Sequence, residues 1–536
     1  MHYVAWIALG LGVAGATLGN GGGGSPPWDA RRAEHLLNRA GFGADTRAVE
    51  RAVERGQAAT VQGLFEVDPW IQEPFYARRR GDVAREPALG TLTPEERRER
   101  TARLRAEDAS QKNAFLGWWV DRMLEGEDAL VERMTLYWHG HFTSSFRELK
   151  SSYEMIAQNQ VFRRLALGSF ADLLSEMAHD PALLIYLDND QSRKGKPNEN
   201  FARELLELFT LGEGNYTEKD VREVARAFTG WGAKTGRFHY APDRHDQGVK
   251  EILGRRGRFD GDDVVAILLE QKACARHVAR RLLAYFEGVE PSPERLEHYA
   301  GFLFENHYRI DLFLRELFLD PDFYRDEVIG ARVASPIDYL VGCARRLGCD
   351  PGGSAVALTA SVLGEQLFGP PSVKGWERGL TWIQSAPPEL PSRLAAVLLG
   401  EVRVRDLVRA EKAEKEEEEL EAGVSEELPA RDYLRTLPEE FRKLARLDLH
   451  PRLDLTHRML LAGCRDDAEV ARCLVEDALA IPVEPELVQH VQERLTERRE
   501  ALGIPEDELL NDPQRSGPIL RELAIEILSL PEARLH

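Results

Sequence analysis

Two histidines separated by a single glycine stand out in the segment MTLYWHGHFTSS as candidates for metal chemistry. His139 and His141 each offer imidazole nitrogens, which are common ligands of Zn, Cu and Fe. Two side chains at this spacing converge on one ion only where the backbone is extended or turns, and Gly140 permits such a backbone. We therefore consider His139 and His141 as ligands of a divalent transition metal. The alternative is a hydrogen-bonded, partly buried pair that packs against the neighbouring aromatic side chains.

Carboxylates occupy two kinds of position in the expected helix NENFARELLELF. At about 100° per residue, Glu199, Arg203 and Glu207 fall on the polar face, where they can form an exposed row of ion pairs. Asn200 and Glu204 fall at the boundary of the apolar face. Partial burial there shifts the pKa of a carboxyl group and favours acid–base or ligand chemistry, so Glu204 is a candidate catalytic residue.

The loop before this helix has the spacing of a calcium-binding loop. Asp188, Asp190, Ser192 and Glu199 occupy the first, third, fifth and twelfth positions, as oxygen ligands do in EF-hand loops. Arg193 stands where such loops need glycine for a sharp turn, and it adds positive charge to the site. We therefore rank calcium below a transition metal as a cofactor.

A further candidate is the segment RHDQGVKEILG. Its residues His245, Asp246 and Lys250 could supply a general base or a metal ligand. An exposed loop histidine is the alternative interpretation. The chain contains no glycine-rich phosphate loop, no GxSxG elbow and no HExxH pair, so these well-marked classes of site are excluded.

Most of the chain after residue 27 has the pattern of successive helices. Helices are expected to begin where a capping side chain precedes proline or an acidic first turn. Strand patterns are few: Phe238 and Tyr240 alternate with polar residues and could pair with residues 249–253. We predict a mainly all-α fold, a large multi-helix array with at most a small β-hairpin. The expected helix starts are Thr93-Pro94, Asp180-Pro181, Thr217-Glu218, Ser292-Pro293, Asp320-Pro321 and Ser335-Pro336.

The composition fits a folded protein and disfavours nucleic acid as a partner. The chain has 536 residues, 43% of them hydrophobic and 30% charged, with 90 acidic and 70 basic side chains and a net charge of −20. These values exclude disordered, collagen-like and multi-span membrane proteins, and a net acidic chain is poorly suited to phosphate backbones. The 5 cysteines form no CxxC and no zinc-like cluster, so we expect them to be buried as small apolar side chains.

An uncharged, apolar segment near the N-terminus predicts export. Residues 3–18 carry no charge and are fewer than the about 20 residues that a membrane span needs. Ala14-Gly15-Ala16 supplies a small-x-small cleavage pattern, and a glycine-rich linker follows. No Lys or Arg precedes the segment, so it is either a cleaved signal peptide or a weak anchor. We predict an extracytoplasmic protein, periplasmic or secreted, that meets the membrane only through this segment if it stays uncleaved.

The expected organisation has four parts. Residues 1–24 form the signal or anchor with its linker, and residues 25–400 form the main helical body. Residues 401–430 form an acidic, charged helical arm, and residues 431–536 form a C-terminal helical bundle that packs on the body.

Five long segments together form a pattern: HLLNRAGFGA, MTLYWHGHFTSS, PNENFARELLELFTLGEGNYTEKDVREVARAFTGW, HDQGVKEILG and PPSVKGWERGLTWI. In this order they resemble a bacterial family catalogued as domain of unknown function 1800, over nearly everything from about residue 30 onward. The resemblance implies an exported helical protein, often encoded beside a sulfatase-like family, and it assigns no catalytic residue. The matching residues are His35, His139, His141, Asn198, Glu199, Asn200, Arg203, Glu204, Trp231, His245, Asp246 and Trp376.

Two functions from different classes are consistent with the sequence. The first is an interaction or scaffold protein of the cell envelope that works with a partner such as a sulfatase-like protein. The second is a metal-dependent envelope hydrolase or oxidase, in which His139 and His141 act with a carboxylate from the NENFARE helix. In that enzyme Glu204 or Asp246 would serve as base or further ligand. Convergence of these side chains in one pocket would favour the enzyme.

Overall fold

The predicted mainly α-helical fold is confirmed. The computed structural model describes residues 27–66, 75, 77–78, 92–126, 128–149, 151–376, 379, 381–384, 390–400, 439–444 and 453–536. These residues form helices and two small antiparallel sheets of two strands each. The expected signal segment (residues 1–24) and acidic arm (401–430) lie outside the described residues. Among the described helices, none has the length and apolar character needed to cross a membrane.

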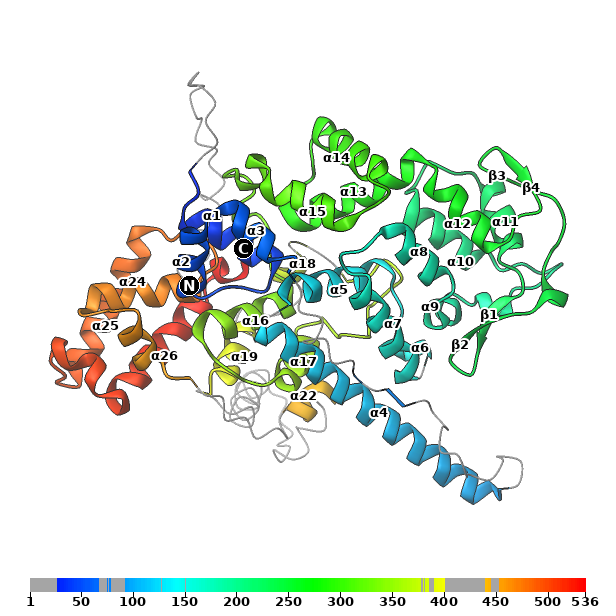
Figure 1. Ribbon diagram of the computed structural model, residues 1–536. Helices are drawn as coiled ribbons and strands as arrows, with labels where there is room; N and C mark the ends of the chain where they lie inside the picture. The colour runs from blue at the N-terminus through cyan, green and yellow to red at the C-terminus, as the bar shows by residue number, and fades with distance from the viewer. Residues whose placement is uncertain are drawn as a thin grey trace, which may run out of the picture.

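The first half of the chain forms the centre of the molecule and one of its ends (Figure 1). A long helix, α4, projects from the body in this view. The helices of this half are α1 (Ala30–Ala40), α2 (Thr46–Arg55), α3 (Gln57–Gly63), α4 (Pro94–Glu125), α5 (Ala129–His141), α6 (Phe146–Leu149), α7 (Ser152–Arg164), α8 (Phe170–Ala178), α9 (Pro181–Tyr186), α10 (Glu199–Glu204), α11 (Glu218–Ala227) and α12 (Gly261–Leu269).

The second half runs back across the centre and ends in a helical group at the opposite end of the molecule (Figure 1). Its helices are α13 (Lys272–Glu287), α14 (Pro293–Glu305), α15 (Ile310–Leu319), α16 (Pro336–Leu347), α17 (Gly353–Val362), α18 (Thr381–Gln384), α19 (Leu390–Leu398), α22 (Glu439–Leu444), α23 (Leu455–Leu461), α24 (Asp467–Ala478), α25 (Pro485–Ala501) and α26 (Pro513–Leu528). Short 3-10 turns connect several of these elements: η2 (Asn189–Gln191), η4 (Pro242–Arg244), η5 (Pro321–Tyr324), η6 (Glu506–Asn511) and η7 (Pro531–Arg534).

The helices begin where the capping pattern predicts. The Thr93 hydroxyl accepts the Glu96 amide at 3.2 Å, and the Glu96 carboxylate accepts the Thr93 amide at 2.8 Å, which is a reciprocal capping box. Thr217 and Asp220 form the same arrangement at the start of α11. The side chains of the other expected caps also accept backbone amides: Asp180, Ser292, Asp320 and Ser335.

The strand pairing differs from the pairing we expected. Strand β1 (Trp231–Lys234) pairs with β2 (Arg237–Tyr240), whereas β3 (Lys250–Ile252) pairs with β4 (Arg255–Gly257). Each hairpin closes through two residues with positive φ: Thr235 with Gly236 (51° and 68°) and Leu253 with Gly254 (47° and 80°). Two-residue turns of this kind match the twist of adjacent strands. Each strand therefore pairs with the strand next to it in the sequence, and residues 238–240 do not pair with residues 249–253.

Apolar side chains gather in two large cores that meet at α5. The first core joins α5 to the helices between α7 and α15 and includes Met134 and Trp138. The second joins α4, α16 and α17 to the C-terminal helices and includes Leu136. Residues on both sides of the boundary expected near residue 400 therefore share one core. All five cysteines are buried, as expected, and none of them forms a disulfide.

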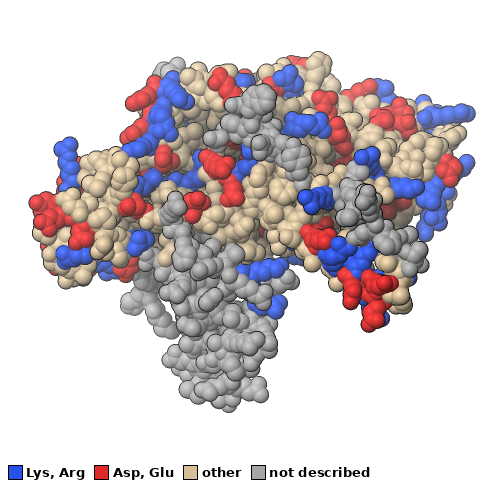
Figure 2. Space-filling model, turned by 60° about the horizontal axis from the view of Figure 1, so that its bottom comes forward, with Lys and Arg blue, Asp and Glu red and all other residues tan. Residues whose placement is uncertain are grey.

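Charged side chains of both signs are mixed on the surface. Figure 2 shows Lys and Arg beside Asp and Glu across the described part of one face. Alternating Arg and Glu on solvated helices produce this pattern. Charged and imidazole side chains that are buried away from solvent lie inside the molecule, on and around α5.

Candidate functional site

Helix α5 is buried on all of its sides. Every residue from Leu130 to His141 is shielded from solvent, although four of them carry ionisable side chains. Buried polar groups are nearly always hydrogen-bonded, because an unpaired one loses its interactions with water. The partners of these side chains therefore show which distant segments α5 holds in place.

Glu132 pairs with two arginines from neighbouring helices. It accepts hydrogen bonds from Arg122 on α4 at 2.9 Å and from Arg163 on α7 at 2.8 Å, and the Trp119 indole donates to it at 2.9 Å. Burial alone would raise the pKa of this carboxyl group, but the charges of Arg163 and Arg122 outweigh burial and lower it. Glu132 is therefore ionised and ties α4, α5 and α7 together.

Arg133, the next residue of the helix, reaches segments far along the chain. Its guanidinium pairs with Asp338 on α16 and donates through Nε to the carbonyl of Gly41 at 2.9 Å. It also donates to the Tyr285 hydroxyl at 3.3 Å. Gly41 belongs to the segment HLLNRAGFGA, and Arg133 directly precedes MTLYWHGHFTSS, so this contact brings α5 against the first of the five segments.

His139 and His141 do not have the geometry that a shared metal ion requires. Gly140 lies inside α5, and residues two apart on a helix point about 200° from each other. The extended or turned backbone that we considered is therefore absent at this position. The observed arrangement matches the alternative interpretation, two buried histidines with separate hydrogen bonds.

Nε2 of His139 already takes part in a hydrogen bond within the protein. It accepts the backbone amide of Phe368 at 3.3 Å, which uses the lone pair of a neutral imidazole. Burial lowers the pKa of His139 to about 3, so the ring is neutral. It packs against the rings of Trp119, Phe368 and Trp376, with the Trp376 ring centre 5.2 Å away.

His141 points to another helix. Its Nε2 donates to the carbonyl of Phe209 at 3.1 Å. Phe209 belongs to a π-helical turn, η3 (Leu205–Thr210), which follows α10 directly. Among the residues that the structure describes, no three His, Cys, Asp or Glu side chains gather in a way that could hold a metal ion.

The π-helical turn exposes carbonyls that the α-helical pattern would have used internally. The carbonyl of Leu208 accepts His277 Nε2 at 2.9 Å and Arg281 Nη1 at 3.1 Å, both from α13. Burial lowers the pKa of His277 to about 4, so it donates as a neutral ring. Such turns are frequent at functional sites. Here the turn connects α5 and α13 to the segment that contains NENFARE.

The polar residues at the start of α10 shape the backbone. Asn198 caps the helix, since its Oδ1 accepts the Asn200 amide at 3.0 Å while its Nδ2 donates to the Asp188 carbonyl at 2.9 Å. Asn200 donates to the carbonyl of Leu187 at 3.4 Å. These two asparagines therefore fix the loop against the helix.

The residues of the calcium-like loop have separate neighbours. The Ser192 hydroxyl accepts the Asn198 amide at 3.1 Å, and Glu199 pairs with Arg203 at 3.6 Å. Burial and the charge of Asp188 raise the pKa of Asp190.

The expected row of ion pairs on this helix is only partly present. Arg203 pairs with Glu199 but binds Glu218 on α11 through both nitrogens, at 2.7 and 2.9 Å. Glu207 instead accepts the Tyr216 hydroxyl at 2.7 Å. The reason is the wider turn that begins at Leu205, because it shifts Glu207 out of α-helical register with Arg203.

Glu204 is the carboxylate of this helix that approaches another of the five segments. It is half-buried, and burial together with the charge of Glu207 raises its pKa. The charges of Arg203 and Lys374 act in the opposite direction. Lys374 belongs to PPSVKGW, so Glu204 lies close to that loop. His139 and His141 instead form hydrogen bonds with backbone groups.

The HDQGVK segment stabilises the β-hairpin end of the molecule. His245 Nδ1 lies 2.9 Å from the carbonyl of Thr229, and Asp246 pairs with Arg226 at 2.9 Å. The hydrogen bond from Arg226 lowers the pKa of Asp246 to about 2. Lys250 is buried and donates to the carbonyl of Asp246 at 2.5 Å. Figure 1 places α11 and β3 at one end of the molecule and α5 near its centre, so this segment is separate from the histidine pair.

Two further candidates pack in aromatic clusters. His35 lies on α1 against Phe323, with ring centres 4.8 Å apart, and burial followed by the charge of Arg39 lowers its pKa. Trp231 contacts the ring of His179 at 4.5 Å and that of Phe238 at 5.0 Å. Both positions are consistent with packing roles.

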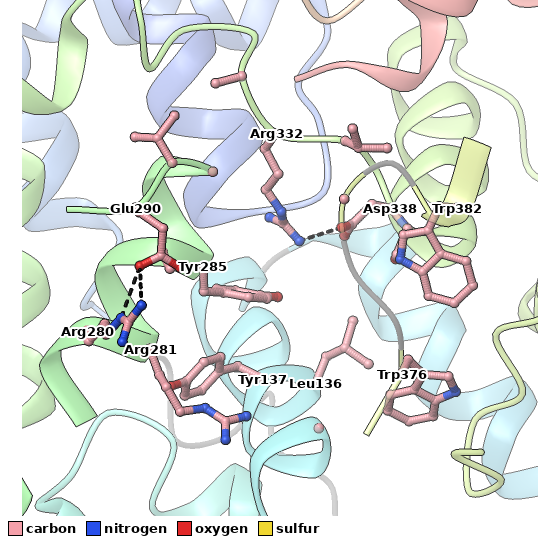
Figure 3. Close-up of a pocket in the computed structure, with 18 of the residues that line it drawn as sticks. Leu136, Tyr137, Arg280, Arg281, Tyr285, Glu290, Arg332, Asp338, Trp376 and Trp382 are labelled. Carbon is pink, nitrogen blue, oxygen red and sulfur yellow. Dashed lines mark hydrogen bonds and ion pairs between the residues drawn. The ribbon is translucent and has the colours of Figure 1, made fainter. Parts of the chain in front are cut away.

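A cavity of about 660 Å³ lies beside α5, and it includes residues that the sequence patterns did not single out. It is bounded by α5, α13, residues 331–338 and residues near 376–382. Figure 3 shows Tyr137 and Tyr285 on one side and Trp376 and Trp382 on the other. The volume lies within the roughly 300–1,000 Å³ that is typical of small-molecule sites.

The roof of the cavity is charged. Arg332 pairs with Asp338 at 2.5 Å, and its guanidinium carbon lies 4.4 Å from the Tyr285 ring centre (Figure 3). Burial would raise the pKa of Asp338, but the charges of Arg133 and Arg332 outweigh burial and hold it well below its usual range. Burial, reinforced by the charge of Asp338, raises the pKa of the lining residue Glu365 to about 7. Two carboxyl groups near one cavity are thus in different protonation states.

Two nitrogens at the cavity lack a partner within the described part of the chain. They are Nη1 of Arg332 and Nε1 of Trp376, both buried N–H donors on lining residues. Unpaired buried donors are uncommon and call for an explanation, such as a bound ligand or water. Nδ1 of His139, which packs against Trp376, also lacks a partner in the described part of the chain, so the unpaired donors mark the cavity together with the adjoining part of α5 as the candidate site.

Sequence patterns identified only one edge of this cavity. Trp376 was a candidate through its motif, and the cavity touches α5 at Gly140. Arg332, Asp338 and Glu365 were missed, because a buried charge is recognised by its partners, and Arg133, the partner that joins Asp338 to α5, lies 205 residues away. No local spacing signals such a contact.

The fold and the site define a class: a mainly helical protein in which one buried polar helix joins two cores beside an aromatic and arginine-lined cavity. The chain belongs to the family described as Protein of unknown function (DUF1800), whose model matches residues 35–532. This confirms the resemblance found in the five segments. No curated protein and no solved structure matches the chain significantly.

The raised pKa of Glu365 leads to a prediction about stability. In the folded protein the pKa of its carboxyl group is about 7, while in the unfolded chain the group loses its proton near its ordinary pKa of 4.5. Folding therefore becomes less favourable as pH rises from about 4.5 to 7. Glu365→Gln removes this penalty and keeps an oxygen that can accept the Ile337 amide. We expect the stability difference between variant and wild type to grow in favour of the variant by about 3 kcal/mol between pH 5 and 8.

Urea unfolding at pH 5, 6, 7 and 8 measures this difference. Burial also raises the pKa values of Glu34 and Asp180 to about 7, but these groups act equally in both proteins. If the free energies of unfolding of the two proteins change with pH in parallel, the surroundings of Glu365 do not raise its pKa.

Proposed function

We propose that this protein is a binding protein of the cell envelope, and that its central cavity holds the ligand. One observation carries the proposal: the cavity is held by contacts around α5, because Trp376 packs on His139 and Asp338 pairs with both Arg133 and Arg332. The walls themselves carry aromatic rings and unpaired donors. Such a lining binds and orients a ligand.

The state of the imidazole groups supports binding over acid–base chemistry. His139, His141 and His277 each hydrogen-bond a backbone group, and burial lowers the pKa values of His139 and His277. A general base must reach the proton that it abstracts. His139 and His141 are 0% and 1% exposed, which leaves no approach for a substrate in this conformation.

The proposal includes an extracytoplasmic location and a protein partner. The uncharged segment of residues 3–18 and the small residues after it support export, to the periplasm or beyond the cell. The resemblance of the five segments supports a sulfatase-like partner. In such a pair this protein would hold a ligand that the partner acts on.

The alternative function, a metal-dependent hydrolase or oxidase, requires His139 and His141 to bind an ion together. We expect purified wild type and the variant His139→Ala/His141→Ala to contain the same trace amount of metal, because the two rings face different partners. Elemental analysis after incubation with Zn²⁺, Mn²⁺ and Cu²⁺ measures this, with far-ultraviolet circular dichroism to show that the variant is folded. One equivalent of metal in wild type that the variant loses would establish the alternative.

Cavity binding can be tested without knowing the ligand. Trp382→Ala removes one ring of an aromatic wall, whereas Arg276→Gln changes an arginine of α13 outside the cavity lining that is 52% exposed and pairs with Glu297. Each protein is incubated with envelope extract, repurified and denatured, and the released small molecules are measured by mass spectrometry. We expect wild type and Arg276→Gln to release a compound that Trp382→Ala releases at about tenfold lower yield, since aromatic anchors dominate binding energy.

Equal release from all three folded proteins, or no release from any of them, would contradict the proposal. The thermal unfolding temperature of each variant serves as the control for folding.

A further inference from the structure

We propose that the cavity binds an acidic sugar, a pyranose unit that carries a carboxylate or a sulfate group. This inference rests on the proposed binding function and names its ligand class. Three features of the cavity carry it: two facing aromatic walls, an excess of buried positive charge at the roof, and donors and acceptors in the same lining.

The aromatic walls are arranged for a flat ring. Trp376 and Trp382 lie on one side of the cavity, and Tyr137 and Tyr285 lie on the other (Figure 3). Aromatic faces carry partial negative charge, so they attract the polarised C–H groups on the faces of a pyranose ring. A sugar unit between the two pairs would bury both of its faces.

The roof of the cavity has more positive than negative charge. Asp338 is the carboxylate that both Arg133 and Arg332 bind, and Arg39 lies in the same buried cluster. Arg39 donates to the carbonyls of Glu287 and Val328 at 3.3 and 2.8 Å. Glu287 is already paired with Arg295 at 2.5 Å. Arg39, Arg133 and Arg332 thus face the ionised carboxylate of Asp338. Glu287 is the other carboxyl group near Arg39, and it is shared with Arg295. Guanidinium groups outnumber carboxyl groups here, so an anion would bring the cluster closer to balance.

Arg332 is the member of this cluster that can reach an anion. It lines the cavity, and its Nη1 has no partner in the described part of the chain. Arginine binds carboxylate and sulfate groups well, because its N–H groups form a planar fork that two oxygens can meet. Trp376 Nε1, an unpaired donor elsewhere in the lining, could donate to a further oxygen of the ligand.

The lining also contains oxygen acceptors. Glu365 and Ser335 lie in the cavity wall, and Arg281 lies at the side opposite Arg332 (Figure 3). Glu365 and Ser335 already accept the amides of Ile337 and Asp338. Sugar hydroxyls both donate and accept, so they can bond the remaining lone pairs of these oxygens as well as the guanidinium groups. A neutral sugar would leave the spare N–H of Arg332 unpaired.

Titration calorimetry on the full chain tests the ligand class with four probes. Trigalacturonate carries carboxylates, neocarratetraose disulfate carries sulfates, 1,4-galactotriose is the neutral match of the first, and 1-naphthoate is an acid without a sugar. We expect wild type to bind at least one acidic oligosaccharide about tenfold or more tightly than galactotriose and naphthoate. The two acidic probes show whether the anion is a carboxylate or a sulfate.

Four variants, one of them a control, assign the binding to the cavity. Trp382→Ala should weaken acidic sugar binding by about tenfold or more, and Trp382→Phe should recover most of it. Arg332→Met should remove the preference for the acidic over the neutral sugar, while the control Arg276→Gln, outside the cavity lining, should change affinity by less than about twofold. Circular dichroism shows whether each variant is folded. If Arg332→Met does not fold, the loss of binding in Trp382→Ala and its recovery in Trp382→Phe still test whether the acidic sugar binds in the cavity.

The outcomes separate this inference from the proposed function. Equal affinity for galactotriose and trigalacturonate, with no gain for the sulfated probe, overturns the acidic class. If no oligosaccharide binds, but wild type still takes up a compound from envelope extract that Trp382→Ala does not, the proposed ligand class is wrong and the binding function stands. If neither oligosaccharides nor extract compounds bind, both fail.

Discussion

A helix that is buried on every side but carries charged and imidazole side chains is the constraint on which this structure depends. Along α5, Glu132, Arg133, His139 and His141 lie out of reach of water, so each must be matched by another part of the chain. Their partners come from α4, α7, α16, the π-helical turn and the backbone near Phe368. Because these partners surround the helix in different directions, satisfying α5 fixes the relative positions of segments from both cores.

The cavity follows from the same constraint. Asp338 is held beside α5 by Arg133, and it also binds Arg332, which forms the roof. Trp376 packs on His139, and Tyr137 is itself part of α5, so both walls rest on this helix. The cost of burying charge is offset by pairing, but the pairing at the roof is uneven, with more guanidinium than carboxylate groups. A site for an anion therefore results from incomplete neutralisation of a buried cluster.

Local features of this fold could be predicted from sequence, whereas the site could not. The caps at Thr93, Thr217 and Ser335 involve residues three positions apart, so their pattern is visible in the sequence. The histidine pair does not have the backbone geometry of a shared metal site. Gly140 permits a turn without requiring one, and it lies inside the buried helix α5. The π-helical turn moved Glu207 out of its expected row, and no residue type marks such a turn. Arg133 and Asp338 carry no local signal of their contact, which only the complete packing of α5 and α16 produces.

The contact between Arg133 and Asp338 is the most direct test of this account. A double-mutant cycle with Arg133→Met, Asp338→Asn and the double variant measures their coupling in the free energy of unfolding. Each single change leaves a buried charge without its main partner, so we expect a loss of about 3–5 kcal/mol from each. The double variant should lose less than the sum, by about 2 kcal/mol or more, because the second change removes the charge that the first left unpaired. Losses that add to within about 0.5 kcal/mol would show that the two residues are not coupled, and α5 would then not depend on its buried partners.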